Sequence, residues 1–151
     1  MSMFDSMNIS ASGLTAQRLR MDVISENIAN INTTRTAQGG PYKRRTVLFQ
    51  EINEQDPFSK NFNEAVKRGI GGTVKGSGVR VSKIVDDNSP GPLMYDPSHP
   101  DADEDGYVRM PNVDIVEEMV NMISASRSYE ASITAINSTK AMLTKTMELG
   151  R

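Results

Sequence analysis

The chain has 151 residues, which leaves room for one domain or for a small core flanked by long helices. A formal charge of −2 argues against a general affinity for nucleic acid, and the absence of cysteine excludes disulfides and thiolate metal sites. Apolar residues make up 37% of the chain and aromatic residues only 5%, so we expect part of the apolar surface to be buried between subunits.

The first fifteen residues contain neither a basic segment nor a continuous apolar segment, and they predict no cleavable secretory signal. No window approaches the roughly 18 apolar residues of a membrane span, so we expect no direct membrane insertion. If the protein leaves the cytoplasm, another export route carries it.

An amphipathic helix is predicted from near the N-terminus to about Ile31, because apolar residues recur there at intervals of seven. Gly13 interrupts this pattern, and it either lets another backbone approach closely or marks a bend. Poor helix formers follow Ile31, and Gly39-Gly40-Pro41 comes after them, so the helix must end in this stretch. The apolar positions are Met7, Leu14, Met21 and Ile28, with Ile24 and Ile31 as a second column.

Residues 37–110 predict extended segments and turns rather than a continuous helix. A β-prone run at residues 46–49 and the alternating valines of residues 79–85 predict two strands, and residues 107–110 predict a short third one. Residues 69–78 contain five glycines and predict a flexible or tightly turning segment. These strands are too few and too short for a large sheet, so we expect one or two hairpins.

Charge is unevenly distributed in this middle region. Seven acidic residues and no lysine or arginine lie between Ile84 and Arg109, whereas five basic residues and no acidic one lie between Val66 and Ile84. Two interpretations are open. The two segments are either solvated loops of opposite sign, or a basic patch of one subunit meets an acidic patch of its neighbour.

A long C-terminal helix is predicted after Asn112, its expected N-cap, and no proline or glycine interrupts it until Gly150. At roughly 37 residues, or about 55 Å, it greatly exceeds the average helix of a globular domain. Ten positions along it alternate steps of four and three, the a/d pattern of a coiled coil, which requires a partner helix. They are Ile115, Met119, Met122, Ser126, Tyr129, Ile133, Ile136, Lys140, Leu143 and Met147.

Sequence motifs for metal binding and catalysis are incomplete in this chain. Asp101 to Gly106 fit the opening of an EF-hand calcium loop, but Asn112 occupies the twelfth position, where a bidentate glutamate is required, and Pro100 excludes an entering helix. An acidic turn is the better interpretation. His99 is the only histidine, so no histidine pair can hold zinc and no cysteine can replace it, and neither a phosphate-binding loop nor a nucleophile elbow occurs. We therefore expect neither an enzyme nor a cofactor.

Two terminal segments carry a recognisable signature: residues 10–34, with the core Asn-Ile-Ala-Asn-Ile-Asn-Thr at 27–33, and residues 112–150. They resemble bacterial flagellar axial proteins, the family of rod and hook subunits. Residues 39–50 and 95–114 are most similar to the proximal rod proteins of that family. Asn32-Thr33-Thr34-Arg35 stands where many hook and distal-rod relatives carry proline and glycine, which also favours the proximal rod.

This resemblance implies a mainly α fold with a small β region. The long N- and C-terminal helices would pair as an antiparallel coiled coil facing the centre of a tubular filament, with a small β-hairpin-rich central domain farther out. The corresponding divisions are residues 1–36, 37–110 and 111–151. The family leaves the cell through the flagellar type III export apparatus, which would explain the missing secretory signal.

The implied function is that of a structural subunit of the proximal rod, a drive shaft that transmits torque across the periplasm. Expected partners are copies of itself, other rod proteins, the junction of membrane ring and export gate, and the distal rod; no small-molecule substrate is expected. The predicted assembly interface comprises Met7, Leu14, Met21, Ile24, Asn27, Ile28, Asn30, Ile31 and Asn32 in the first helix, and Ile115, Met119, Met122, Tyr129, Ile133, Ile136, Leu143 and Met147 in the last.

Two alternatives stay open. A cytosolic helical adaptor or chaperone could use the same apolar positions to hold partner helices, and it would be a stable folded dimer at low concentration. A calcium-binding module would instead order around Asp101 to Gly106 when the metal is added.

Overall fold

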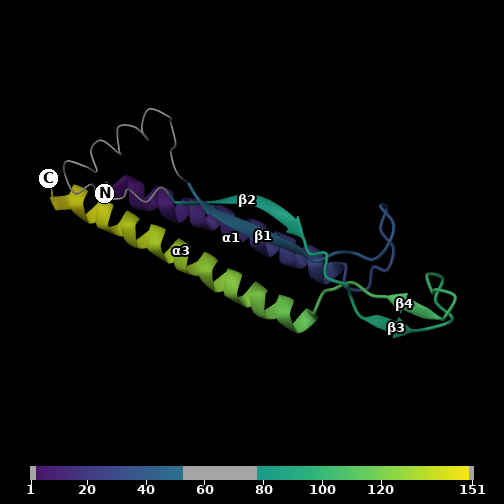
Figure 1. Cartoon of the computed structure of the whole chain (residues 1–151). Coiled ribbons are helices and arrows are strands. Elements are labelled where there is room, and N and C mark those ends of the chain that lie inside the picture. Colours follow the sequence, from purple (N-terminus) through teal and green to yellow (C-terminus); the bar gives the residue numbers. More distant parts are fainter. Residues whose placement is uncertain (1–2, 53–77, 150–151) are drawn as a thin grey trace, which may run out of the picture.

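A computed structural model describes residues 3–52 and 78–149 of the chain (Figure 1). Two long helices flank a small β region, and the predicted fold class is confirmed. In chain order the elements are α1 (Met3–Ala29), β1 (Arg45–Glu51), β2 (Val79–Asp86), β3 (Leu93–Tyr95), β4 (Tyr107–Arg109) and α3 (Ile115–Leu149). The strands form two antiparallel two-stranded sheets, one of β1 with β2 and one of β3 with β4.

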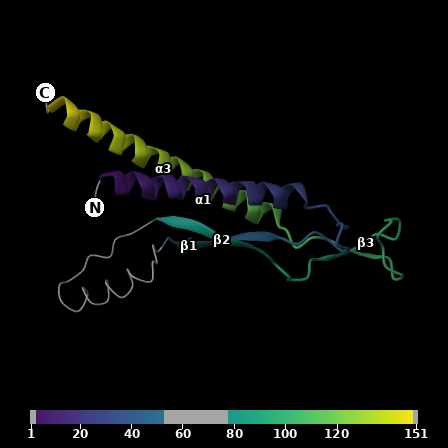
Figure 2. The same ribbon diagram turned by 90° about the horizontal axis from the view of Figure 1, so that it is seen from above.

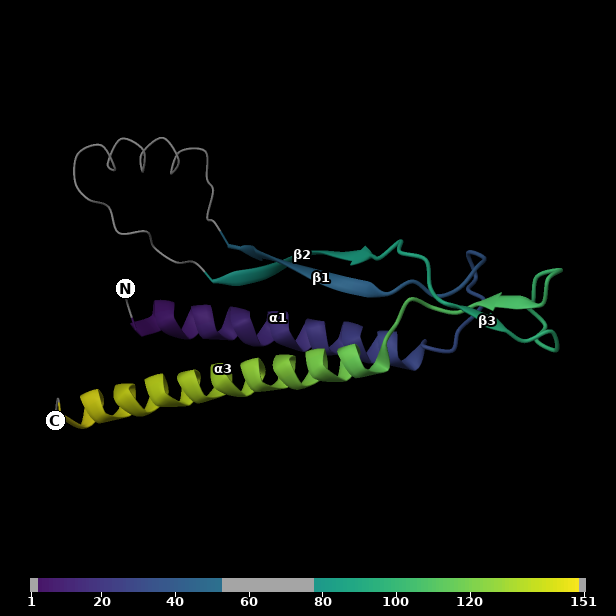
Figure 3. The same cartoon turned by 60° about the horizontal axis from the view of Figure 1, so that its bottom comes forward.

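Helix α1 is the middle layer of the molecule. It contacts α3 on one side and the sheet of β1 and β2 on the other (Figures 2 and 3). The two helices are antiparallel, because Asn27 near the end of α1 bonds to Glu118 near the start of α3, and Gly13 approaches Ser132 farther along. The strands β3 and β4 extend beyond the helices at the end where α3 begins.

Gly13 of α1 faces Ser132 of α3. A Cβ atom built at Gly13 would lie 3.4 Å from the hydroxyl oxygen of Ser132, which is ordinary van der Waals contact. α1 continues through Gly13 and α3 lies close to it here, but an alanine side chain would also fit, so the contact does not require glycine.

The helix boundaries follow local side-chain chemistry. α1 ends at Ala29, because Asn30 turns back to donate its side-chain amide to the carbonyl of Glu26 at 2.9 Å. The prediction that Asn112 caps the last helix is wrong. Asp114 is the cap, since its carboxylate accepts the backbone N–H groups of Val116 at 2.7 Å and Glu117 at 3.3 Å.

The predicted strands at residues 46–49, 79–85 and 107–110 are confirmed as β1, β2 and β4. Strand β3 was not predicted, because its three residues directly follow Pro92 and are too few to show a period. The glycine-rich segment lies outside the described residues except for Gly78. Gly78 has φ of 98°, and a Cβ there would lie 2.4 Å from Ser12 Oγ, so glycine is required where β2 reaches α1.

The segment before β3 crosses the segment after β4 at Gly91. A Cβ atom at this position would lie 2.0 Å from the carbonyl oxygen of Met110, so even alanine forces the backbone apart. We expect Gly91→Ala to lower the free energy of unfolding by about 1–3 kcal/mol, measured by urea denaturation. Gly13→Ala is the matched control, and it should be neutral or stabilising by up to about 1 kcal/mol because it restores helix propensity. Equal effects of the two changes would contradict the crossing geometry.

Candidate assembly interface

The face of α3 that packs on α1 repeats in steps of four and three. We call it the inner face. Glu118, Ala125 and Thr139 are buried on it, and the residues between them are half-buried. Small or polar side chains thus alternate with large ones along the contact, which lets the two backbones lie close together. In chain order the inner face is Glu118, Met122, Ala125, Tyr129, Ser132, Ile136, Thr139 and Leu143.

The structure divides the predicted interface residues of α3 into two groups. Four of them lie on the inner face: Met122, Tyr129, Ile136 and Leu143. The other four are exposed, and their exposed fractions are 46% for Ile115, 54% for Met119, 37% for Ile133 and 76% for Met147.

In α1 the predicted residues differ in burial. Ile24 and Asn27 are fully buried, together with Ala16 and Val23, which the seven-residue pattern did not include. Half-buried positions are Met7, Leu14, Met21, Ile28, Asn30 and Ile31, whereas Asn32 is exposed.

Asn27 is the centre of a buried hydrogen-bond network, and all four of its side-chain bonding positions are used. Its amide donates to the carbonyl of Arg45 and to Glu118 Oε2, both at 2.9 Å. Its carbonyl oxygen accepts the Tyr42 hydroxyl and the backbone N–H of Arg45, also at 2.9 Å. One side chain that is only 1% exposed therefore joins α1, α3 and the start of β1.

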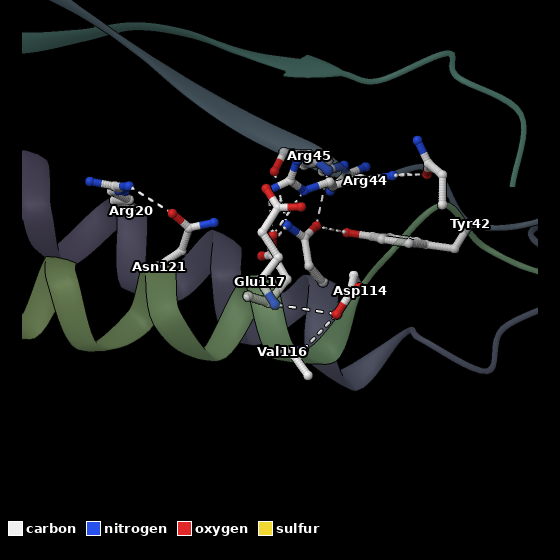
Figure 4. Close-up of polar contacts among 11 residues, drawn as sticks. Arg20, Tyr42, Arg44, Arg45, Asp114, Val116, Glu117 and Asn121 are labelled. Carbon is white, nitrogen blue, oxygen red and sulfur yellow. Dashed lines mark hydrogen bonds and ion pairs between the residues drawn. The ribbon is translucent and has the colours of Figure 1, made fainter.

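Glu118 is the charged member of this network, and its side chain is 2% exposed. It forms an ion pair with Arg44, whose Nε and Nη2 atoms lie 2.8 and 2.7 Å from Glu118 Oε1. Arg44 also reaches Glu117 at 2.7 Å (Figure 4). Burial opposes the charge of Arg44, but the bonds and charges of Glu118 and Glu117 outweigh it and raise the pKa of Arg44 above its ordinary value.

Tyr42 completes the cluster from the turn after α1. Its ring is buried, and burial together with the nearby charge of Glu26 raises the pKa of the Tyr42 hydroxyl above its ordinary value. The hydroxyl thus stays protonated and donates to Asn27 at neutral pH. Arg45, the next strand's first residue, bonds outward to Glu26 at 2.6 Å.

The three predicted asparagines of α1 and its turn have separate roles. Asn27 joins three segments, Asn30 ends the helix and accepts the Thr33 hydroxyl at 3.1 Å, and Asn32 is exposed. A fourth asparagine, the predicted cap Asn112, has another role. Asn112 accepts the backbone N–H of Arg44 at 2.8 Å and donates to the carbonyl of Asp87 at 3.2 Å, so it fastens the chain just before α3.

A cleft of about 380 Å³ lies beside this network, between α1, α3 and β1. Arg20 of α1 donates across it to Asn121 of α3 at 3.2 Å (Figure 4). The cleft walls combine charged groups with the apolar side chains of Val23, Val47 and Phe49. The described residues contain no group of three or more His, Cys, Asp or Glu that could hold a metal ion.

The first turns of α3 carry an exposed apolar surface that faces away from α1. We call it the outer stripe. Its members at positions 116, 120 and 123 were missed, although their spacing of four and three is itself a signal for a second helix face. The exposed fractions are 46% for Ile115, 67% for Val116, 54% for Met119, 62% for Val120 and 52% for Ile123.

The acidic turn of residues 101–106 contacts the segment that follows α1, through Asp101. Asp101 accepts the Thr34 hydroxyl at 2.8 Å and pairs with Arg35 at 3.5 Å. Gly106 closes the turn with φ of 77°. Asp101 is thus bound to the segment after α1, and calcium binding here stays a hypothesis. No helix among the described residues is long and apolar enough to cross a membrane.

Comparison with known proteins gives consistent matches. A family model described as "Flagella basal body rod protein" matches residues 7–35, and one described as "Flagellar basal body rod FlgEFG protein C-terminal" matches residues 104–149. The flagellar basal-body rod protein FlgC of Bacillus subtilis is 49% identical, over the whole of both chains. That of Borreliella burgdorferi is 51% identical over 94% of this chain and 93% of its own. That of Escherichia coli O157:H7 is 38% identical over the whole of both chains.

Proposed function

The chain belongs to the FlgC family of flagellar basal-body rod proteins, and we propose that it polymerises through its terminal helices to form a torque-transmitting layer of the proximal rod. It is a structural subunit of the basal-body rod and assembles with other rod components. The observation that carries the proposal is the division of α3 into two faces. The inner face holds the subunit together, and the outer stripe is left for neighbours.

We propose that the predicted interface residues form two sets with different partners. The first set would stiffen the helix pair within a subunit. It comprises Met7, Leu14, Met21, Ile24, Asn27, Ile28, Asn30 and Ile31 of the first helix and Met122, Tyr129, Ile136 and Leu143 of α3. The second set would contact neighbouring subunits, and it comprises Asn32, Ile115, Met119, Ile133 and Met147. The exposure of the four apolar members supports this assignment, because exposed apolar surface is typical of a protein–protein contact, and Asn32 is exposed as well.

The wider arrangement is part of the same proposal. Residues 1–36 and 111–151 would face the rod axis, and residues 37–110 would lie farther out. The rod would cross the periplasm, with the membrane-ring and export-gate junction below and the distal rod above. The role is mechanical rather than catalytic, and no cofactor is required.

An in-frame deletion of the gene in the source bacterium tests the function. We expect basal bodies purified from the deletion strain to keep a membrane ring but to lack rod and hook, as seen by electron microscopy. The intact gene should restore them, whereas a gene lacking residues 112–151 should not, because α1 then has no partner helix. Intact, rotating flagella in the deletion strain would refute the rod function and leave the helical adaptor as the leading interpretation.

A further inference from the structure

The inner face of α3 nearly repeats itself every seven residues. One column is large and apolar: Met122, Tyr129, Ile136 and Leu143. The other column is small: Ala125, Ser132 and Thr139, and Thr146 continues the same spacing. A displacement of α3 along α1 by seven residues, about 10 Å, therefore replaces each side chain with one of similar size. Packing alone discriminates poorly between these two alignments.

Glu118 breaks the repeat. It precedes Ala125 by seven residues and occupies the first position of the small column, and it is the single charged residue of the inner face. Its carboxylate receives the Asn27 amide at 2.9 Å and the Arg44 guanidinium at 2.7 Å. No other position of the inner face offers these two donors a buried anion.

We propose that Asn27, Glu118 and Arg44 form a register pin that selects one alignment of α3 on α1 and excludes the alignment displaced by seven residues. In the displaced alignment Ala125 would lie opposite Asn27, and Glu118 would move past the end of α1. Asn27 and Arg44 would then lose their shared acceptor in a buried environment, which is costly. A single buried polar position sets helix register in coiled coils by the same physics.

The consequence for assembly rests on the proposed function. The sheet of β1 and β2 is fixed to α1, whereas the outer stripe belongs to α3. A displacement of about 10 Å would separate these two surfaces from their normal positions, and a displaced subunit would not fit a regular polymer. The pin would therefore act as an alignment control for each subunit added.

Disulfide trapping can measure the register directly, because the natural chain contains no cysteine. Gly13→Cys with Ser132→Cys reports the native alignment, since a Cβ at Gly13 lies 3.4 Å from Ser132 Oγ. Gly13→Cys with Thr139→Cys reports the displaced alignment. In the purified full-length chain under mild oxidation, we expect the native disulfide to form at least about tenfold faster. Equal rates would overturn the proposal.

The pin is then removed with Arg44→Met and Glu118→Leu together, which replaces the buried ion pair by apolar groups without leaving a buried lone charge, since Glu117, the other partner of Arg44, is exposed. We expect the ratio of native to displaced disulfide to fall from about tenfold to about twofold. The matched control is Arg45→Met with Glu26→Leu. This pair is as short, at 2.6 Å, but its side chains are more exposed and it joins α1 to β1 rather than to α3, so the ratio should not change. A ratio that stays native without the pin, or that falls equally in the control, would overturn the proposal.

Circular dichroism accompanies the assay to confirm that both variants remain helical. Should the pin-less variant lose helix, Glu118→Gln decides, because glutamine keeps an acceptor for Asn27 while removing the ion pair with Arg44. We expect a fall of about threefold with native helicity, and an unchanged ratio would overturn the proposal. The disulfide ratios are measured on the purified chain alone. Their outcome is therefore independent of the deletion experiment that tests the rod function.

Discussion

Replacing Asn27 with alanine is expected to lower the free energy of unfolding by about 3 kcal/mol or more, measured by urea denaturation of the full-length chain. The change removes four hydrogen bonds, two of them buried and two part-buried, and leaves their partners without Asn27. These partners are the Tyr42 hydroxyl, both backbone groups of Arg45 and one oxygen of Glu118. Each buried polar group without a partner costs about 1–3 kcal/mol, and partial access of water keeps the total below the simple sum.

Another asparagine of the same signature, Asn32, is the control. Asn32 is exposed, and Asn32→Ala should change the free energy of unfolding by no more than about 0.5 kcal/mol. Cells carrying Asn27→Ala should also lose swimming in soft agar, whereas Asn32→Ala tests the subunit contact proposed for that residue. Equal, small effects of both changes on unfolding would mean that the network does not hold the three segments together.

The two helices and most strands were predictable because each shows a period within a short stretch of chain. The network around Asn27 was not. Glu118 follows Asp114 and Glu117 at the start of α3, where acidic residues are common because of the helix dipole. Its burial depends on Asn27 and Arg44, which lie 91 and 74 positions away along the chain. No local pattern reports such a contact.

The inner face of α3 illustrates a second limit. Its small column consists of alanine, serine and threonine, and Ala125 and Thr139 are buried there although neither side chain is large and apolar. A search for apolar residues at steps of four and three therefore found Ile115 and Met119, which are exposed, instead of Glu118 and Ala125. The same search also found Met122, Tyr129, Ile136 and Leu143, which do lie on the inner face.

Exposed apolar residues on α3 lead to the second large effect, on assembly rather than on folding. We expect Val120→Asp to abolish rod formation while changing the free energy of unfolding by less than about 1 kcal/mol, because Val120 is 62% exposed in the subunit. Burying a valine between subunits contributes about 1.5–3 kcal/mol, and an aspartate there adds the cost of a buried charge. A polymer repeats this loss at every contact, so a modest change in each subunit prevents growth.

The measurement is the yield of complete basal bodies from complemented deletion cells, together with urea denaturation of the purified variant. Asn137→Asp is the matched control, since it introduces the same charge at an exposed polar position of the same helix. It should leave at least about half of the normal yield, because an exposed polar site tolerates such a change. Normal yield with Val120→Asp would show that the outer stripe faces solvent in the rod. Loss of folding in that variant would instead place Val120 inside the subunit, so the pair of measurements separates an interface from a core.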